Sequence, residues 1–206
     1  YFPFGGMQLD MLRTANELVA RGHNVDVFTL SWQGELPTEI KVHVLSQSGW
    51  FNFTRYQKFI DATFEIIRQG GFDYIFGYNR MPGLDAHFAA DPCFIERAHM
   101  QRNWFYRLTP RYKWFASCEM AIFSKDLSVQ ILAVSLTEMP HFQHWYGTQS
   151  DRFHYVPPFL STERFALQDK STMRAYLRKT FDFGSEDFVY LLTGSGFAMK
   201  GLDRAI

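Results

Sequence analysis

The feature that most constrains the fold of this chain is a regular alternation of short apolar segments with segments of helical periodicity. The apolar segments are short and bounded by turn-forming residues, which is typical of buried strands. Candidate strands occupy residues 24–30, 40–45, 73–77, 131–134 and 153–158. Strands that alternate with helices favour an α/β fold, with a parallel sheet covered by helices on both faces.

The helices between these strands are predicted from apolar spacing. Between Met7 and Arg21 the apolar residues recur every three or four positions, and Gly22 stands where a helix-ending glycine is expected. Residues 54–68 repeat this spacing, and two glycines follow them. A short helix is also expected from Thr137.

The two ends of the chain lack parts of an α/β unit. The chain starts at Tyr1 with a turn and a helix, so we expect the first strand to be absent. Near the other end we expect a helix over 172–180, a strand over 188–193 and part of a helix over 201–206. The prediction is a fragment of a longer protein, with one domain over 1–158, a linker over 159–171 and the truncated start of a second domain over 172–206.

Composition excludes several classes of protein. Hydrophobic residues make up 47% and aromatic residues 18% of the 206 residues, which excludes a disordered chain. Cys93 and Cys118 lie far apart, so neither a disulfide framework nor a cysteine-based zinc site is supported, and a reducing cytoplasm is expected. No apolar run approaches the roughly eighteen residues of a membrane-spanning helix, so we expect a soluble or at most membrane-associated protein.

Two glycine turns are candidates for binding an anion. Gly5 and Gly6 precede a helix, whose first backbone N–H groups and positive dipole end attract negative charge. A second turn runs from Gly194 through Gly196 to Lys200, which places an ammonium beside backbone donors, as a diphosphate requires. The alternatives are an ordinary tight turn and a solvent-facing lysine.

Asp91 is the candidate at the end of a strand. It follows the small-residue segment 88–90, and the carboxyl ends of the strands in an α/β sheet are where ligands bind. The alternative is that Asp91 caps the next helix. The spacing of Glu96 and Glu119 does not support a carboxylate-pair hydrolase. His141 and His144 have no third metal ligand in view, so a metal site is not supported. No Gly-x-Ser-x-Gly motif is present, which excludes serine hydrolase chemistry.

Residues 94–123 form a basic aromatic segment in a chain whose net charge is zero. The segment has five basic residues, two acidic residues and eight aromatic residues. Cations beside aromatic rings suit the boundary between water and anionic lipid headgroups. The residues predicted to contact a membrane are Arg102, Trp104, Arg107, Arg111, Lys113 and Trp114. Alternatively, the rings pack in the core and the cations face solvent.

Several motifs together resemble one known family. They are YFPFGG at residues 1–6, NRMPGLD at 79–85, FAAD at 88–91, FYRLTPRY at 105–112, VPP at 156–158 and GSGFAMKGLDR at 194–204. In this order they resemble the bacterial lipopolysaccharide core α-1,3-glucosyltransferases, retaining enzymes of glycosyltransferase family 4. The resemblance implies the GT-B fold, in which two Rossmann-like domains face each other across a cleft. The likeness runs from Tyr1 to Ile206.

The resemblance also implies an activity and its partners. It implies transfer of glucose from UDP-glucose to a heptose of the inner core, without a metal or another cofactor. The partners would be a nucleotide sugar, a lipid-anchored oligosaccharide acceptor and an anionic membrane surface, with no nucleic acid. The enzyme would be cytoplasmic and peripheral on the inner face of the inner membrane.

Site roles carry over by position. The residues expected to bind substrate are Gly5, Gly6, Arg164 and Gly196. Asp91 would reach the sugar or the acceptor. Lys200 would neutralise the leaving diphosphate. Two positions depart from the family pattern: Met199 stands where arginine is usual, and Phe159 stands where glycine is usual. The family's Glu-x₇-Glu motif lies beyond the residues given.

Two competing functions remain open from the residues alone. One is a non-catalytic membrane- or nucleic-acid-binding module that uses residues 94–123, because aromatic rings between arginines can also stack on bases. The other is a nicotinamide-dependent enzyme, which is disfavoured because no acidic residue follows a full glycine fingerprint at the expected distance.

Overall fold

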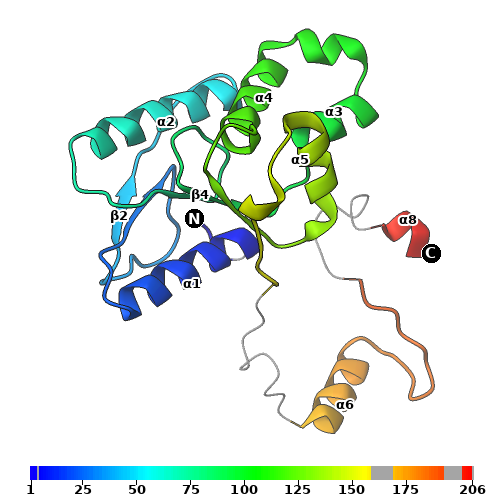
Figure 1. Cartoon of the computed structure of the whole chain (residues 1–206). Helices are drawn as coiled ribbons and strands as arrows, with labels where there is room; N and C mark the ends of the chain where they lie inside the picture. The colour runs from blue at the N-terminus through cyan, green and yellow to red at the C-terminus, as the bar shows by residue number, and fades with distance from the viewer. Residues whose placement is uncertain (4, 159–168, 193–200, 206) are drawn as a thin grey trace. The chain divides into compact units, whose positions relative to one another are not determined.

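The computed structural model describes residues 1–3, 5–158, 169–192 and 201–205. The chain divides into two compact units, Tyr1–Phe159 and Leu160–Ile206, and each is treated by itself. Figure 1 shows the course of the chain. The predicted linker falls mostly on residues outside the described ranges, so the domain boundaries stay a prediction.

Unit 1 contains six parallel strands in two sheets. The strands are β1 (Asp26–Thr29), β2 (Lys41–Val44), β3 (Phe76–Gly77), β4 (Ala86–Ala89), β5 (Gln130–Ala133) and β6 (Phe153–Tyr155). One sheet pairs β1 with β2, and the other has the order β3-β4-β5-β6. All pairs are parallel, which confirms the predicted α/β class.

Helices connect these strands. They are α1 (Gly6–Ala20), α2 (Asn52–Arg68), α3 (Phe94–Gln101), α4 (Pro110–Phe123) and α5 (Met139–Tyr146), with 3₁₀ turns η1 (Trp104–Leu108), η2 (Leu136–Glu138) and η3 (Ser150–Arg152). Figure 1 shows α1 on one side of the strands and α2 and α4 on the other, so helices lie on both faces, as predicted. The predicted end of α1 is confirmed, because Gly22 follows the last turn with a φ of +88° that favours glycine.

The core of unit 1 lies where α4 and α5 pack on β5. Phe123 of α4 and Phe142 of α5 stack with ring centroids 3.8 Å apart. Ile122 and Ile131 are fully buried beside them. This core packs against β4 and β5, and the candidate residue Asp91 follows the end of β4.

Unit 2 contains α6 (Lys170–Thr180) and α8 (Leu202–Ala205) within its described residues. The strand predicted over 188–193 is wrong for residues 188–192, which form no strand, while residue 193 lies outside the described ranges. Phe188 and Tyr190 are more than four-fifths exposed at 81% and 86%. A strand needs a neighbour for its backbone groups, and the described part of unit 2 supplies none.

Candidate functional site

The start of the chain lies at the carboxyl edge of the strands, the edge at which α/β sheets bind ligands. The Tyr1 backbone nitrogen lies 3.2 Å from Thr29 Oγ1 at the end of β1 and 2.5 Å from the Ser31 carbonyl oxygen. The Gln33 N–H donates to the Tyr1 carbonyl at 3.1 Å. Because α1 begins only a few residues later, its N-terminus lies close to the end of β1.

The N-terminus of α1 has no side-chain cap. Gly5 is the N-cap residue, with an extended backbone (φ −86°, ψ 131°), and no acidic residue stands in the first turn. A Cβ on Gly5 would lie 2.8 Å from the Phe2 ring and 1.8 Å from Gln8 Oε1, whereas a Cβ on Gly6 would meet nothing within 4 Å. A side chain would therefore not fit at Gly5, and no side-chain cap takes the first amides of α1. Such uncapped amides are the donors that the predicted anion-binding role requires.

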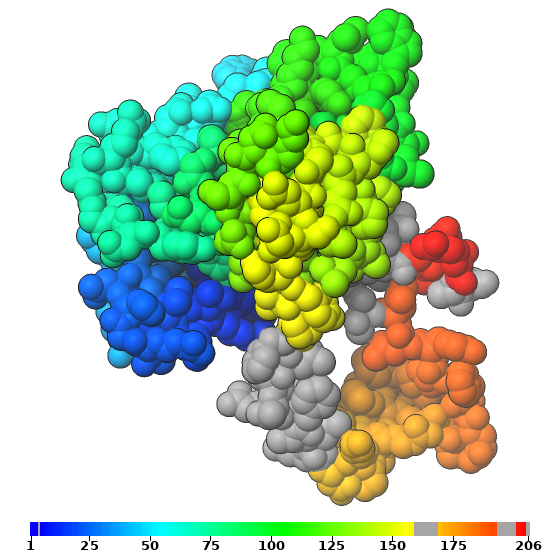
Figure 2. Space-filling model, in the orientation of Figure 1, coloured from blue at the N-terminus to red at the C-terminus, as the bar shows by residue number. Residues whose placement is uncertain are grey.

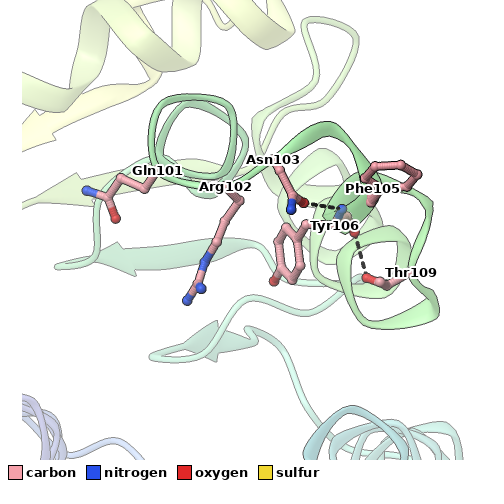
Figure 3. Close-up of a pocket in the computed structure, with 6 residues that line it drawn as sticks. All are labelled: Gln101, Arg102, Asn103, Phe105, Tyr106 and Thr109. Carbon is pink, nitrogen blue, oxygen red and sulfur yellow. Dashed lines mark hydrogen bonds between the residues drawn. The ribbon is translucent and has the colours of Figure 1, made fainter.

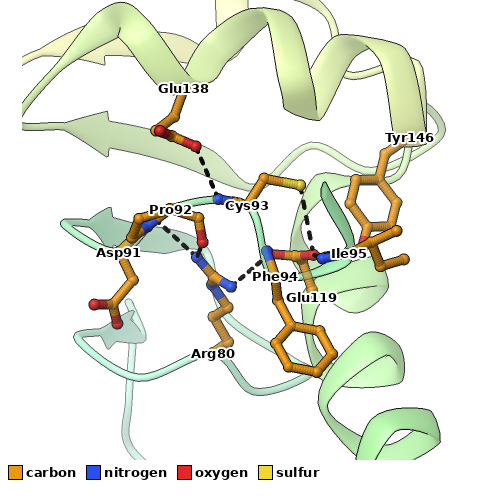
Figure 4. A network of polar contacts seen from close by, with 9 residues as sticks. All are labelled: Arg80, Asp91, Pro92, Cys93, Phe94, Ile95, Glu119, Glu138 and Tyr146. Atoms are coloured by element: carbon orange, nitrogen blue, oxygen red, sulfur yellow. Dashed lines mark hydrogen bonds and ion pairs between the residues drawn. The ribbon is translucent and has the colours of Figure 1, made fainter. Parts of the chain in front are cut away.

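Asp91 lies just beyond β4, and it does not cap the next helix. The N-cap of α3 is Cys93, and no side-chain cap hydrogen bond is formed there. Asp91 is exposed, and Figure 4 shows its carboxylate pointing away from the polar network around Glu119. The helix-cap alternative is therefore wrong. Among the described residues no side chain pairs with this carboxylate, so it remains available at the carboxyl edge.

Glu119 of α4 takes the capping role instead. Its carboxylate is fully buried and accepts from the backbone N–H groups of Phe94 (2.7 Å) and Ile95 (3.1 Å) at the start of α3. Arg80 Nη1 (2.5 Å) and the Tyr146 hydroxyl (2.6 Å) donate to the same carboxylate. Figure 4 shows these donors converging on Glu119 from three elements.

Sequence reasoning missed this role of Glu119, because it tested Glu119 only as an acid/base partner of Glu96. Burial and then the charge of Glu119 raise the pKa of the Cys93 thiol to about 12. Burial and the same charge raise the pKa of Tyr146. The Cys93 thiol and the Tyr146 hydroxyl therefore stay protonated, and the role of the network is structural. The sequence signal for a buried carboxylate was that Glu119 is the single acidic residue among the mostly apolar residues 114–123.

Comparison with known proteins identifies the family. Residues 4–164 match the family described as Glycosyltransferase Family 4. The chain belongs to glycosyltransferase family 4. It is 33% identical over 206 residues to "Lipopolysaccharide glucosyltransferase WaaG" of Escherichia coli (strain K12), a match that covers 100% of this chain and 55% of that protein.

A solved structure carries the same match. The crystal structure of WaaG, a glycosyltransferase involved in lipopolysaccharide biosynthesis, matches this chain with a TM-score of 0.90 at 33% identity. The match covers 100% of this chain and 55% of that structure, so the chain spans about half the length of these relatives. The resemblance inferred from the motifs and the GT-B fold class are thereby confirmed.

Several predicted site residues of this family 4 chain lie outside the described residues. They are the substrate-binding Arg164 and Gly196, the diphosphate-binding Lys200, and the two departures at Phe159 and Met199. Of the predicted catalytic and substrate-binding residues, the structure therefore describes Gly5, Gly6 and Asp91. Their roles and those of the other predicted site residues stay predictions.

Residues of η1 and the start of α4 form an exposed surface, called here the basic aromatic surface. Its exposed members are Arg102, Trp104, Phe105, Leu108, Arg111 and Lys113. Gln101, Arg102, Asn103, Phe105, Tyr106 and Thr109 line a shallow hollow of about 420 Å³ on it (Figure 3). In Figure 2 the green segment that contains this surface forms the upper rim of unit 1, beside the cyan start of α2.

Two residues predicted to contact a membrane also bond to other parts of the protein. The Trp114 indole donates to Gln57 Oε1 of α2 at 2.7 Å, and its ring is half-buried against the core. Arg107 is also half-buried, and its guanidinium donates to His99 Nδ1 at 3.2 Å. Desolvation and then the charge of Arg107 lower the pKa of His99, so the ring accepts this bond in its neutral form.

Two further findings concern the described residues as a whole. No three histidine, cysteine, aspartate or glutamate side chains among them are grouped as metal ligands. None of their helices is both long and apolar enough to cross a bilayer.

Proposed function

We propose that this chain forms the acceptor-side half of a retaining glycosyltransferase that moves glucose from UDP-glucose to a heptose of the lipopolysaccharide inner core. The observation that carries the proposal is the 33% identity to WaaG over the whole chain, together with membership of family 4. This membership favours the transferase over a non-catalytic binding module and over a nicotinamide-dependent enzyme. The term full-length form denotes this chain within a protein of its relatives' length.

The uncapped start of α1 supports a role in holding the donor. When the bond between the glucose anomeric carbon and the diphosphate breaks, UDP leaves with the bonding electron pair and negative charge grows on its phosphate oxygens. The first amides of α1 at Gly5 and Gly6, with the predicted cation Lys200, would stabilise that charge. Arg164 and Gly196 would complete the donor site, and no metal is assigned a part in it.

Asp91 is proposed to act on the sugar side of the same edge. Its carboxylate is exposed and lies beyond the end of β4. A carboxylate there can accept a hydrogen bond from a hydroxyl group of glucose or of the acceptor and hold that group in position for transfer. The contribution would come from orientation, which is worth several kcal/mol when the reacting groups are held close together.

The basic aromatic surface supports docking on an anionic membrane. An acceptor anchored in lipid is confined to a surface, so docking would keep the enzyme near it. Arg102, Arg111 and Lys113 supply positive charge beside the exposed ring of Trp104. The proposed location is accordingly the cytoplasmic face of the inner membrane, as a peripheral protein.

The test is transfer measured with the full-length form. It should transfer glucose from UDP-glucose to a heptose-containing acceptor with retention of anomeric configuration, and a chelator should not abolish the activity. Lys200→Ala should lower turnover by about a hundredfold, as loss of a transition-state charge donor does. The isolated 206 residues should show no turnover. If the full-length form releases no UDP with any hexose donor, the proposal is wrong.

Asp91→Ala should reduce transfer by about tenfold or more without changing thermal stability, because its carboxylate is exposed and unpaired among the described residues. Asp126→Ala is the matched control, since Asp126 is also exposed but precedes β5 at the opposite edge of the sheet. Equal activity of the two variants would remove Asp91 from the site.

A further inference from the structure

The backbone around Asp91 is held by side chains from distant parts of the chain. Arg80, in the loop after β3, donates through Nη2 to the carbonyls of Asp91 (2.9 Å) and Pro92 (2.8 Å). Glu138 Oε2 accepts from the Cys93 N–H at 3.0 Å. With the Glu119 bonds to the start of α3, every residue from 91 to 95 has a backbone group bonded to one of these side chains (Figure 4).

Arg80 and Glu119 are the central members of this arrangement. Their ion pair of 2.5 Å joins the loop after β3 to α4, and the two side chains are 15% and 0% exposed. The planar guanidinium has donors at both ends, so one end meets Glu119 while the other meets the two carbonyls. The bond from Arg80 to the Asp91 carbonyl thereby joins the NRMPGLD motif to the FAAD motif, and the ion pair with Glu119 ties both to α4.

The Asp91 side chain takes no part in the bonds that Arg80, Glu119 and Glu138 make to this segment. The Asp91 carboxylate makes none of these bonds and faces away from them (Figure 4). If the purpose were only to cap α3, Glu119 alone would suffice, because it already satisfies the first two amides of that helix. The additional bonds to the Asp91 and Pro92 carbonyls set the direction in which the Asp91 side chain leaves the backbone.

We infer that Arg80 and Glu119 are positioning residues for the transfer reaction, which fix the Asp91 carboxylate at the carboxyl edge of β4. The inference rests on the proposed function, because it takes Asp91 as the group that orients a sugar hydroxyl. A displacement of about 1 Å in such a group can lower the rate about a hundredfold. Loss of the Arg80–Glu119 pair should therefore lower kcat and leave the binding of UDP-glucose largely unchanged.

The test is a double-mutant cycle in the full-length form. Arg80→Met and Asp91→Ala should each lower kcat by about tenfold or more. If Arg80 acts through Asp91, the double variant should lie within about twofold of Asp91→Ala, because the second change has nothing left to displace. Arg80→Lys should recover only part of the activity, since an ammonium can pair with Glu119 but lacks the second set of donors for the two carbonyls.

Two further variants separate positioning from stability. Glu119→Gln removes the buried charge at nearly constant volume, and it should repeat the cycle if Arg80→Met folds poorly. Arg152→Met is the matched control, because Arg152 is also buried and bonds only carbonyls at Ile122, Ser124 and Val129. Arg152→Met should lower the unfolding temperature and leave kcat of the folded protein unchanged. In combination with Asp91→Ala, the effects of the two substitutions should be independent.

Amide hydrogen exchange gives a readout that does not depend on activity. The amides of Cys93, Phe94 and Ile95 should exchange faster in Arg80→Met than in Arg152→Met. Unchanged exchange, losses of kcat that multiply in the cycle, or an Asp91→Ala variant of full activity would each overturn the positioning role. Absence of transfer by the unsubstituted full-length form would instead refute the proposed function, while the exchange measurement would still test the Arg80–Glu119 pair.

Discussion

The basic aromatic surface can be neutralised without altering the core. Its three exposed cations are Arg102, Arg111 and Lys113. The guanidinium groups of Arg102 and Arg111 lie over the rings of Tyr106 (5.7 Å) and Phe115 (5.1 Å). Residues 94–123 contain five basic and two acidic residues, so replacing these three by serine removes the net charge of the segment. Arg107 is left in place, because it is half-buried and donates to His99.

The size of the effect follows from the number of exposed cations. Each cation near an anionic surface contributes about 1 kcal/mol, so three contribute about 3 kcal/mol, or roughly 100- to 200-fold in vesicle affinity. Arg107→Ser alone should change binding by much less, because its guanidinium is directed at the protein. Since charges are screened beyond about 10 Å at 0.1 M salt, high salt should reproduce most of the loss.

The assay is cosedimentation of the full-length form with anionic and with neutral vesicles, at low and at high salt. The triple variant should lose most of its binding to anionic vesicles and still transfer glucose to a soluble acceptor analogue. Thermal unfolding should match that of the unsubstituted protein to within a few degrees. Equal binding to both kinds of vesicle, or undiminished binding by the triple variant, would refute electrostatic docking.

Three other predictions concern buried groups. Arg152→Met leaves three carbonyls without their donor, an effect offset in part by relief of a buried charge, so it should cost about 3 kcal/mol and lower Tm by about 6–12 °C in calorimetry. Burial lowers the pKa of His87 to about 3, so the unfolded state binds the extra proton first as the pH falls below about 6.5. Denaturant titrations should therefore show a loss of about 2 kcal/mol between pH 7 and pH 5 that is absent in His87→Phe. Trp114→Ala should lower Tm through lost packing and the lost Gln57 bond, yet leave vesicle binding intact in cosedimentation.

Local patterns in the sequence determined the class of fold and most of its elements. The apolar spacing of 7–21 and 54–68 predicted α1 and α2, because side chains three and four positions apart share one face of a helix. The short apolar runs predicted the strands of unit 1, and the motif order indicated the family. These signals are carried by residues close together in the chain, so they can be read without coordinates.

Tertiary structure alone decided which residues meet. Glu119 and Arg80 are 39 positions apart, and only the packing of α4 against the loop after β3 makes them an ion pair. Likewise, only the packing of α4 against α2 brings Trp114 to Gln57, 57 positions away in the chain. Residues 188–192 form no strand for the converse reason: a strand exists only with a neighbour, and an apolar run does not specify one. Pairing between distant residues depends on the folded backbone, and therefore no local pattern records it.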